Sequence, residues 1–285
     1  MVGSDRTWLG DPSVFHGEGA FWDAAVGALR YVDMFRGDVV TLEDGRSTRT
    51  HVGDVAALVR SRAAGGYVVA TEQGFALLDP DLRAEREVRA FEEPGIRMNE
   101  GACDVSGRLY CGSMAYDLSP HRGTLYLLDT DLSVHVVLER VSVPNGLVWS
   151  SDGRTAFHAD TVAGKVFTYE VDVATGAFGA SRVFLDFTSM PGAPDGMALD
   201  DEGGLWVAMW QGGAVRRFDP TGRLTDTVPT GVSNPTSCAF GGADGRTLFI
   251  TTSQDGLDGR TEPRAGQVLA VEVGVRGAPV HMFGG

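Results

Sequence analysis

One short pattern repeats along the chain, and this repeat limits the possible folds more than any other feature. In its clearest copies a short strand is followed by an Asp, Ser and Gly turn and then by a second strand. These copies are residues 102–112, 146–154 and 196–208. A third β-rich run follows each copy, at residues 123–129, 164–170 and 213–219. Helical periodicity is nearly absent, so the sequence predicts an all-β protein.

Weaker copies complete a set of six units. They cover residues 20–33, 55–70 and 237–251, and the last has a third strand at 267–271. Six units of about 40–50 residues match the period of propeller blades. One unit cannot bury both faces of its small sheet, so the units must stack, and a closed ring leaves few exposed edges. We therefore predict one six-bladed β-propeller domain over residues 1–285. The regular period disfavours a β-sandwich or two β-domains.

Either end of the chain is a candidate for completing a blade. The N-terminal candidate is residues 6–9, RTWL, and the C-terminal candidate is residues 279–283, PVHMF. The sequence leaves open which of them closes the ring.

Charge and composition exclude several classes of function. Lys and Arg total 24 and Asp and Glu total 38, a formal charge of −14. This balance argues against binding nucleic acid or an anionic membrane. No apolar run approaches the ~18–20 residues of a membrane span, and no signal peptide opens the chain. The three cysteines fit no disulfide or zinc pattern and predict buried free thiols. We expect a cytoplasmic protein, monomeric or weakly homo-oligomeric.

The repeat also predicts which side chains meet at the channel. The residue that opens the first turn sets the register of each unit, and the position five residues earlier begins the innermost strand. The six equivalent residues are Glu18, Val55, Asn99, Asn145, Asp195 and Thr236. Because first strands are innermost in a propeller, these positions converge on its axis. Two carboxylates and two amides are ligands that a hard divalent cation prefers, and such an ion would relieve the repulsion between the carboxylates.

Turn chemistry offers an alternative explanation of these polar residues. Asn145 and Asp195 each stand between Pro and Gly, where Asn and Asp are ordinary turn residues. Four hard ligands at one repeat position favour the metal site, so we predict that Glu18, Asn99, Asn145 and Asp195 bind one divalent cation.

Several segments resemble the regucalcin/gluconolactonase (senescence marker protein) family, and the resemblance covers nearly the whole chain. The matching segments are 17–22 (GEGAFW), 97–101 (RMNEG), 104–108 (DVSGR), 112–114 (GSM), 145–150 (NGLVWS), 194–197 (PDGM) and 235–242 (PTSCAFGG). The resemblance implies a six-bladed propeller with one ion in the channel, held by the four residues that the register also predicts.

The resemblance further implies hydrolysis of a sugar lactone to its aldonic acid. It places the substrate-contacting residues at Arg97 and Asn99, with an acidic residue at Asp117. We expect Tyr116 to read substrate hydroxyls beside Asp117. The alternative for Arg97 is a surface ion pair with Glu92 or Glu93. The segment 115–122 departs from the animal members, which leaves the particular lactone open.

Lactone hydrolysis needs a polarised carbonyl, an attacking water and a stabilised oxyanion. The metal would act as the Lewis acid, with Asp195 as general base and Glu18 as the competing candidate. His16 and Glu18 can face the same side of a strand, although a local hydrogen bond is the simpler role for His16. The ion could be Ca²⁺, Mg²⁺, Mn²⁺, Zn²⁺ or Fe²⁺.

Two other functions fit the same residues. One is a metal-dependent hydrolase of another ester, lactone or phosphotriester, because a fold does not fix its substrate. The other is a non-enzymatic propeller in which the divalent ion is structural. A serine esterase and a nucleotide-dependent enzyme are disfavoured, because neither a nucleophile elbow nor a dinucleotide fingerprint is present.

Overall fold

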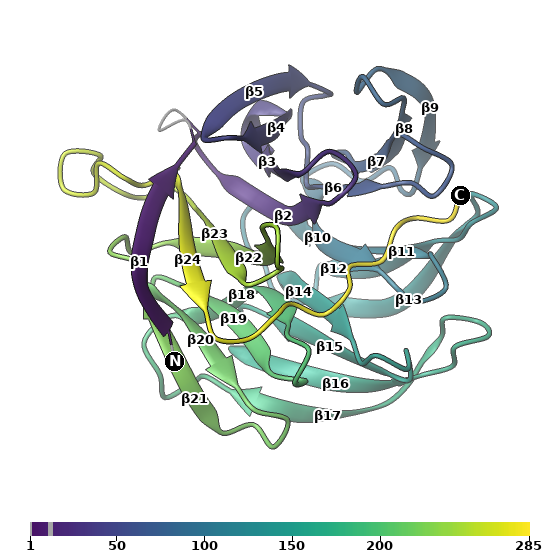
Figure 1. The fold of residues 1–285 in the computed structure, drawn as a ribbon. Coiled ribbons are helices and arrows are strands. Elements are labelled where there is room, and N and C mark those ends of the chain that lie inside the picture. Colours follow the sequence, from purple (N-terminus) through teal and green to yellow (C-terminus); the bar gives the residue numbers. More distant parts are fainter. Residues whose placement is uncertain (1, 11–13) are drawn as a thin grey trace.

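The strands are arranged as a ring of six sheets around a central channel (Figure 1). The computed structural model describes residues 2–10 and 14–285. Each sheet has four strands, and neighbouring strands within a sheet run antiparallel. The predicted six-bladed β-propeller is confirmed.

Five blades are formed by consecutive strands. The first is β2 (Gly17–Asp23), β3 (Ala28–Asp33), β4 (Asp38–Glu43) and β5 (Arg46–His51), with the short 3₁₀ helix η1 (Met34–Arg36) after β3. The second is β6 (Leu58–Ser61), β7 (Tyr67–Ala70), β8 (Gly74–Leu78) and β9 (Ala84–Arg89). The third is β10 (Ile96–Cys103), β11 (Leu109–Ala115), β12 (Gly123–Leu128) and β13 (Val134–Val141). The fourth is β14 (Pro144–Trp149), β15 (Thr155–Asp160), β16 (Lys165–Val171) and β17 (Phe178–Asp186). The fifth is β18 (Ala193–Leu199), β19 (Leu205–Trp210), β20 (Ala214–Phe218) and β21 (Leu224–Pro229).

Burial falls from the centre of the ring outward. The innermost strand of the third blade, β10, is buried at every residue except Ala102, which is half-buried. The outermost strand β9 of the second blade is almost wholly exposed, and its sequence AEREVR is rich in charge. Apolar side chains therefore fill the spaces between blades, and charged residues face solvent on the outer edges.

The sixth blade is completed by the N-terminal strand. It consists of β22 (Pro235–Gly241), β23 (Thr247–Thr252), β24 (Val268–Val273) and, outermost, β1 (Val2–Leu9). β1 pairs antiparallel with β24, with Trp8 opposite Leu269. Joining the first strand to the last sheet closes the ring with hydrogen bonds between segments far apart in the sequence.

The C-terminal candidate for closing the ring is wrong. Residues 274–285, here called the C-terminal strap, leave β24 and cross the end of the channel (yellow in Figure 1). The amide of Ala278 donates to the carbonyl of Leu199, and a bridge links Phe283 to Arg62 in the second blade. The Phe283 side chain is fully buried. The strap therefore joins blades on opposite sides of the channel and does not lengthen a sheet.

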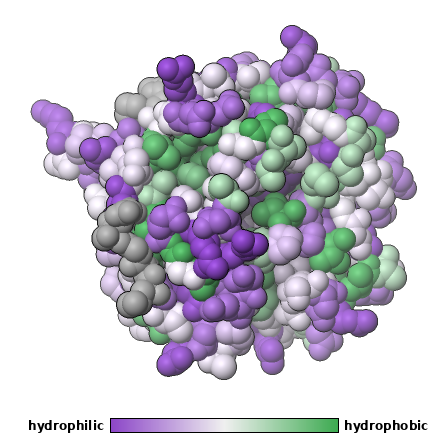
Figure 2. All heavy atoms as spheres, in the orientation of Figure 1, coloured by the Kyte–Doolittle hydropathy of each residue, from purple (hydrophilic) through white to green (hydrophobic). Residues whose placement is uncertain are grey.

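Figure 2 shows the face that the strap crosses, where hydrophilic and hydrophobic residues are interspersed. No helix in the described part of the chain is long and apolar enough to span a membrane. The three cysteines are free and buried, as predicted.

Candidate metal centre

The inner strands carry a local irregularity at the residues that the sequence register singled out. In β2 the pairing shifts between Glu18 and Phe21, and in β18 it shifts between Pro194 and Met197. The inner strands β10, β14 and β22 shift at the equivalent place. Such shifts are produced by β-bulges, which bend a strand and re-aim its side chains, often beside functional sites. Five inner strands therefore turn side chains toward the axis at the end of the channel where these strands begin, here called the mouth.

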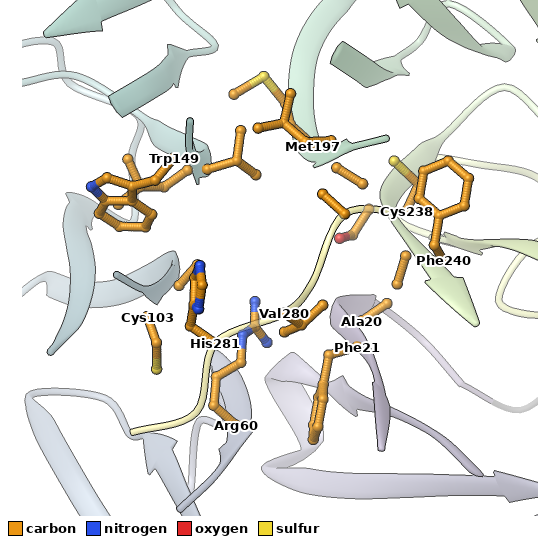
Figure 3. A pocket seen from close by; sticks show the side chains of 18 of the residues that line it. Ala20, Phe21, Arg60, Cys103, Trp149, Met197, Cys238, Phe240, Val280 and His281 are labelled. Atoms are coloured by element: carbon orange, nitrogen blue, oxygen red, sulfur yellow. The ribbon is translucent and has the colours of Figure 1, made fainter. Parts of the chain in front are cut away.

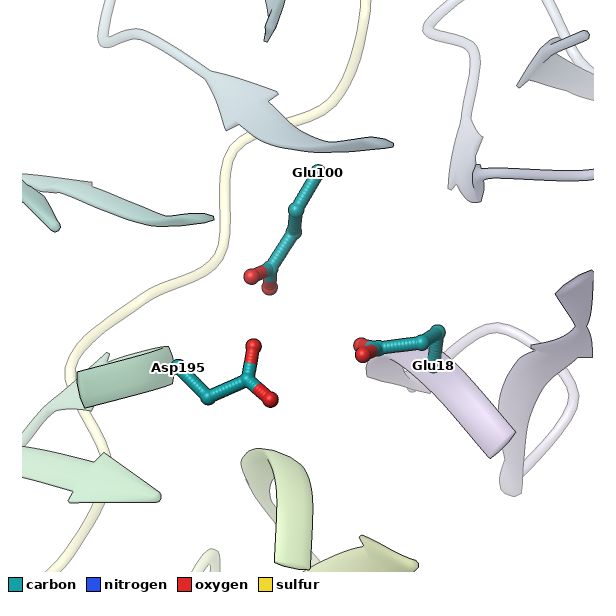
Figure 4. A group of neighbouring side chains, drawn as sticks. All are labelled: Glu18, Glu100 and Asp195. Carbon is teal, nitrogen blue, oxygen red and sulfur yellow. The ribbon is translucent and has the colours of Figure 1, made fainter. Parts of the chain in front are cut away.

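Three carboxylates meet at this mouth. Glu18, Glu100 and Asp195 come from three different blades, and each offers a carboxylate oxygen within 4.8 Å of the others. Their side chains point toward one another in the channel (Figure 4). All three are buried, with exposed fractions of 3–5%. We call these three residues the acidic cluster.

Burial and mutual repulsion disfavour the charged form of the cluster. Burial, followed by the charge of Glu100, raises the pKa of Glu18 well above its usual value. Burial and the charges of Glu18 and Glu100 do the same to the pKa of Asp195. Burial raises the pKa of Glu100 to about 7, although the nearby Arg60 cation opposes this. Three like charges in a buried site need a compensating cation if they are to stay ionised at neutral pH.

The hydrogen bonding of the cluster fits such a cation. Glu100 Oε2 and Asp195 Oδ1 are buried and find no hydrogen-bond partner among the described residues. Buried polar atoms are nearly always satisfied, so each of these oxygens needs a missing partner. Carboxylate oxygens are preferred ligands of hard divalent ions, and a bound ion would satisfy both atoms. The residues present therefore fit a divalent cation.

The two predicted amide ligands lie together in neighbouring blades. Asn99 Nδ2 donates to Asn145 Oδ1 at 2.8 Å and to the carbonyl of Pro144 at 2.9 Å. Asn145 Nδ2 donates to Thr161 Oγ1 at 2.7 Å. Both amides are buried and fixed by these bonds. Each amide oxygen accepts one hydrogen bond, which leaves it a second lone pair for a ligand.

Arg97 belongs to the mouth and not to a surface ion pair. Its Nη1 donates to Asn99 Oδ1 at 2.7 Å, and its guanidinium lies 5.6 Å from the centre of the Tyr116 ring. Its Nε has no partner among the described groups. Glu93 pairs instead with Arg122. Glu92 is likewise near another arginine, so the alternative of a surface ion pair of Arg97 with Glu92 or Glu93 is wrong, and Arg97 keeps an unused donor.

The two residues expected to read substrate hydroxyls are occupied elsewhere. The Tyr116 hydroxyl donates to Glu72 Oε1 at 2.6 Å. Asp117 is exposed, and its Oδ1 accepts from the backbone amide of Ser119 at 3.0 Å. Tyr116 thus meets the site with its ring, over Arg97, while Asp117 has no described contact with the acidic cluster.

His16 both makes a side-chain hydrogen bond and lies on the same side of the strand as Glu18, the two arrangements that the sequence suggested. Its Nδ1 hydrogen-bonds Ser253 Oγ at 2.8 Å, and its Nε2 lies 3.6 Å from Glu18 Oε1. Burial and the Arg97 charge lower its pKa to about 3. The imidazole is therefore neutral at pH 7 and packs within ring-contact distance of Phe35 and Trp210.

Glu100 is the member of the acidic cluster that the register did not predict. Strict alternation sends Asn99 toward the channel and its neighbour Glu100 away from it. The register shift between Met98 and Gly101 breaks this alternation, so both consecutive side chains reach the mouth. The one feature of the sequence that could have indicated Glu100 is its place directly after Asn99, a predicted ligand.

A cavity of about 100 Å³ lies in the channel between the acidic cluster and the C-terminal strap. Figure 3 shows Arg60, Cys103 and Cys238 at its walls and Val280 and His281 of the strap across it. Glu100 lines both this cavity and the acidic cluster. The strap therefore crosses the channel at the end opposite the mouth.

The fold and the acidic cluster define a six-bladed β-propeller with buried carboxylates at one mouth of its channel. The family model of the SMP-30/Gluconolactonase/LRE-like region matches residues 16–254. The chain belongs to this family, as the sequence resemblance indicated.

Its relatives cover nearly the full length of the chain. Regucalcin of Gallus gallus is 35% identical over 299 residues, covering 100% of this chain and 97% of the relative. A solved calcium-binding protein, regucalcin from Agrobacterium tumefaciens, superposes with a TM-score of 0.89 at 26% identity, covering 97% and 96% of the two chains. A luciferin-regenerating enzyme superposes with a TM-score of 0.87 at 27% identity, covering 98% and 100%.

Proposed function

We propose that this protein is a divalent-metal-dependent lactonase that opens an aldonolactone to the aldonic acid. The observation that carries the proposal is the acidic cluster, in which one oxygen of Glu100 and one of Asp195 lack hydrogen-bond partners among the described residues, as does the Nε of Arg97. Membership of a family that includes gluconolactonases supports the reaction class. A calcium-binding relative supports a divalent ion.

The chain's own residues divide the work of hydrolysis. Glu18, Glu100 and Asp195 would hold the ion, with Asn99 and Asn145 offering amide oxygens beside them. When bound, the ion would supply Lewis-acid polarisation of the lactone carbonyl. Asp195 would hold the ion through one carboxylate oxygen and take the proton from the attacking water through the other.

The bond changes balance without a further reactant. Water adds to the carbonyl carbon, the ring C–O bond breaks, and the departing ring oxygen takes up a proton. The product is a hydroxy acid. Arg97 can donate its unused Nε–H to the oxygen on which negative charge develops.

A second candidate substrate is an ester or lactone with fewer hydroxyl groups. It is favoured by the engagement of the Tyr116 hydroxyl with Glu72 and by the remote contacts of Asp117. A third possibility is that the ion is structural, in which case binding would occur without turnover.

A substrate panel tests the reaction and separates these candidates. Proton release would be followed from glucono-, galactono-, xylono- and arabinonolactone, an unsubstituted δ-lactone, an aryl ester and a phosphotriester. We expect turnover of at least one aldonolactone that a chelator abolishes and a returned divalent ion restores. Faster turnover of the unsubstituted lactone would favour the second candidate. No turnover on any compound would contradict the proposed activity.

A further inference from the structure

The second blade departs from the pattern of the others at the mouth. Its inner strand β6 pairs with β7 without a register shift, and the equivalent mouth residue is the apolar Val55. Five residues later, where three other blades have an aspartate, this blade has Arg60. Arg60 is 6% exposed and lines the axial cavity, into which Figure 3 shows it reaching. A buried cation therefore stands in the blade whose mouth residue has no side-chain oxygen or nitrogen.

The guanidinium of Arg60 links the blades on either side of it. Its Nη1 donates to the carbonyl of Gly19 in the first blade at 2.8 Å and to its own Val59 carbonyl at 2.7 Å. Its Nη2 donates to the carbonyl of Gly101 in the third blade at 2.9 Å. One side chain thus holds the backbone of three adjacent blades.

The two distant carbonyls belong to the residues that follow the cluster acids. Gly19 comes directly after Glu18, and Gly101 comes directly after Glu100. Both glycines lie where the inner strands change register. Space around them is tight: a Cβ on Gly101 would lie 1.8 Å from the Tyr110 carbonyl oxygen. The Arg60 bonds therefore fix the backbone from which Glu18 and Glu100 project.

We infer that Arg60 is a positioning residue that sets the geometry of Glu18 and Glu100 for a divalent cation. The inference rests on the proposed metal site and does not require the proposed reaction. Arg60 binds backbone on both sides and is not a metal ligand, because a guanidinium has no acceptor atom.

The charge of Arg60 and its positioning role predict opposite effects on metal binding. A cation beside the site repels a metal ion, so removing the charge alone would tighten binding. Loosening two of the carboxylates would weaken binding, because an ion gains most from ligands already held in place. Lysine keeps the charge but cannot reproduce the planar fork that reaches both neighbouring blades. Comparing R60M with R60K therefore separates the two effects.

The test is calorimetric titration of chelator-stripped protein with Ca²⁺, for wild type, R60M and R60K. We expect R60K, which loses the fork but keeps the repelling charge, to bind Ca²⁺ about tenfold or more weakly, as for other residues that hold metal ligands, and R60M, which loses both, to bind with an affinity between those of R60K and wild type. Ca²⁺ affinity that is unchanged or tighter in both variants would overturn the inference. If R60M does not fold, R60K decides, because wild-type affinity there would equally overturn it.

A matched control is R108M. Arg108 is also buried and donates to carbonyls of a neighbouring blade, at Val173 and Ala174, with no described contact to the acidic cluster. We expect R108M to lower the melting temperature without changing Ca²⁺ affinity. Equal loss of affinity in R108M and R60M would overturn the positioning role. Turnover is measured separately, so Ca²⁺ binding without lactone hydrolysis would count against the reaction alone.

Discussion

Three buried carboxylates facing one another are costly for a folded chain unless something compensates their charge. Glu18, Glu100 and Asp195 have no lysine or arginine in direct ion-pair contact among the described residues. Arg60 donates hydrogen bonds to backbone carbonyls, and Arg97 donates to the side chain of Asn99 and the carbonyl of Met98. Such an arrangement persists in proteins where it has a function, which here we propose to be holding a cation.

The first prediction concerns the ligands themselves. Asp195→Ala and Asn145→Ala should lower divalent-metal affinity at least about tenfold while the protein stays folded. Asp195→Ala should also lower kcat/KM on a lactone about 10²–10⁴-fold, because it removes the proposed base. Calorimetry and proton release measure the two effects. Glu87→Ala, in the exposed outer strand β9, serves as the control. Near wild-type rates for Asp195→Ala would contradict both of its proposed roles.

The second prediction concerns pH and the metal-free protein. The pKa of Glu100 is raised to about 7 by burial, so its neutral form stabilises the fold and its charged form does not. This stabilisation is fully present below its usual pKa of 4.5 and is lost as the pH rises through about 7. Stripped wild type should therefore lose stability relative to stripped Glu100→Gln as the pH rises from 5 to 8.

The comparison with Glu100→Gln is needed because buried histidines act in the opposite direction. Burial lowers the pKa of His16 to about 3 and of His158 to about 4, which costs stability as the pH falls below their usual value. Both proteins share this effect, so it cancels. Denaturant unfolding at each pH measures the difference. A difference that does not change with pH would contradict the account of Glu100.

At the scale of strands, the sequence predicted which positions of a regular strand face the channel, but it did not predict the register shifts that interrupt this regular alternation of side chains. The repeat period placed Glu18 and Asp195 at one mouth because equivalent blade positions must converge on the axis. Glu100 escaped prediction because a register shift places two consecutive residues on one face. Such shifts depend on how neighbouring strands pair, which a single strand's sequence does not encode.

The sequence did not decide which terminal segment closes the ring, for a similar reason. Residues 6–9 and residues 279–283 both carry apolar side chains that a neighbouring sheet could cover. Pairing of β1 with β24 gives the last blade its fourth strand. The strap instead buries Phe283 in the cluster of apolar residues shared by the first three blades. The choice between them is made by contacts distant in sequence.

The third prediction tests the strap as a structural element. Phe283 is fully buried, so Phe283→Ala should destabilise the protein by about 3–5 kcal/mol. The adjacent Met282 is 54% exposed, and Met282→Ala should change stability by less than about 0.5 kcal/mol. Denaturant unfolding of both variants measures the contrast. Equal stability of the two variants would show that the strap does not anchor through Phe283.

At the scale of the whole molecule, the ring explains how distant segments make one site. Glu18, Glu100 and Asp195 are far apart in the sequence, yet each lies on the innermost strand of its own blade. Closure by β1 and the crossing of the strap hold those blades in one ring. The fold is shared with relatives of several names, so the substrate depends on the mouth and its loops and not on the ring.

The most direct test of the central claim is a titration of chelator-stripped protein with a divalent ion while lactone hydrolysis is followed by proton release. We predict that turnover rises in proportion to the ion added and saturates at one ion per chain. Glu18→Gln should fail to reach wild-type turnover at the same ion concentration. Full turnover in stripped protein, or turnover that does not change with ion concentration, would contradict the claim that the protein is a lactonase whose acidic cluster binds the metal.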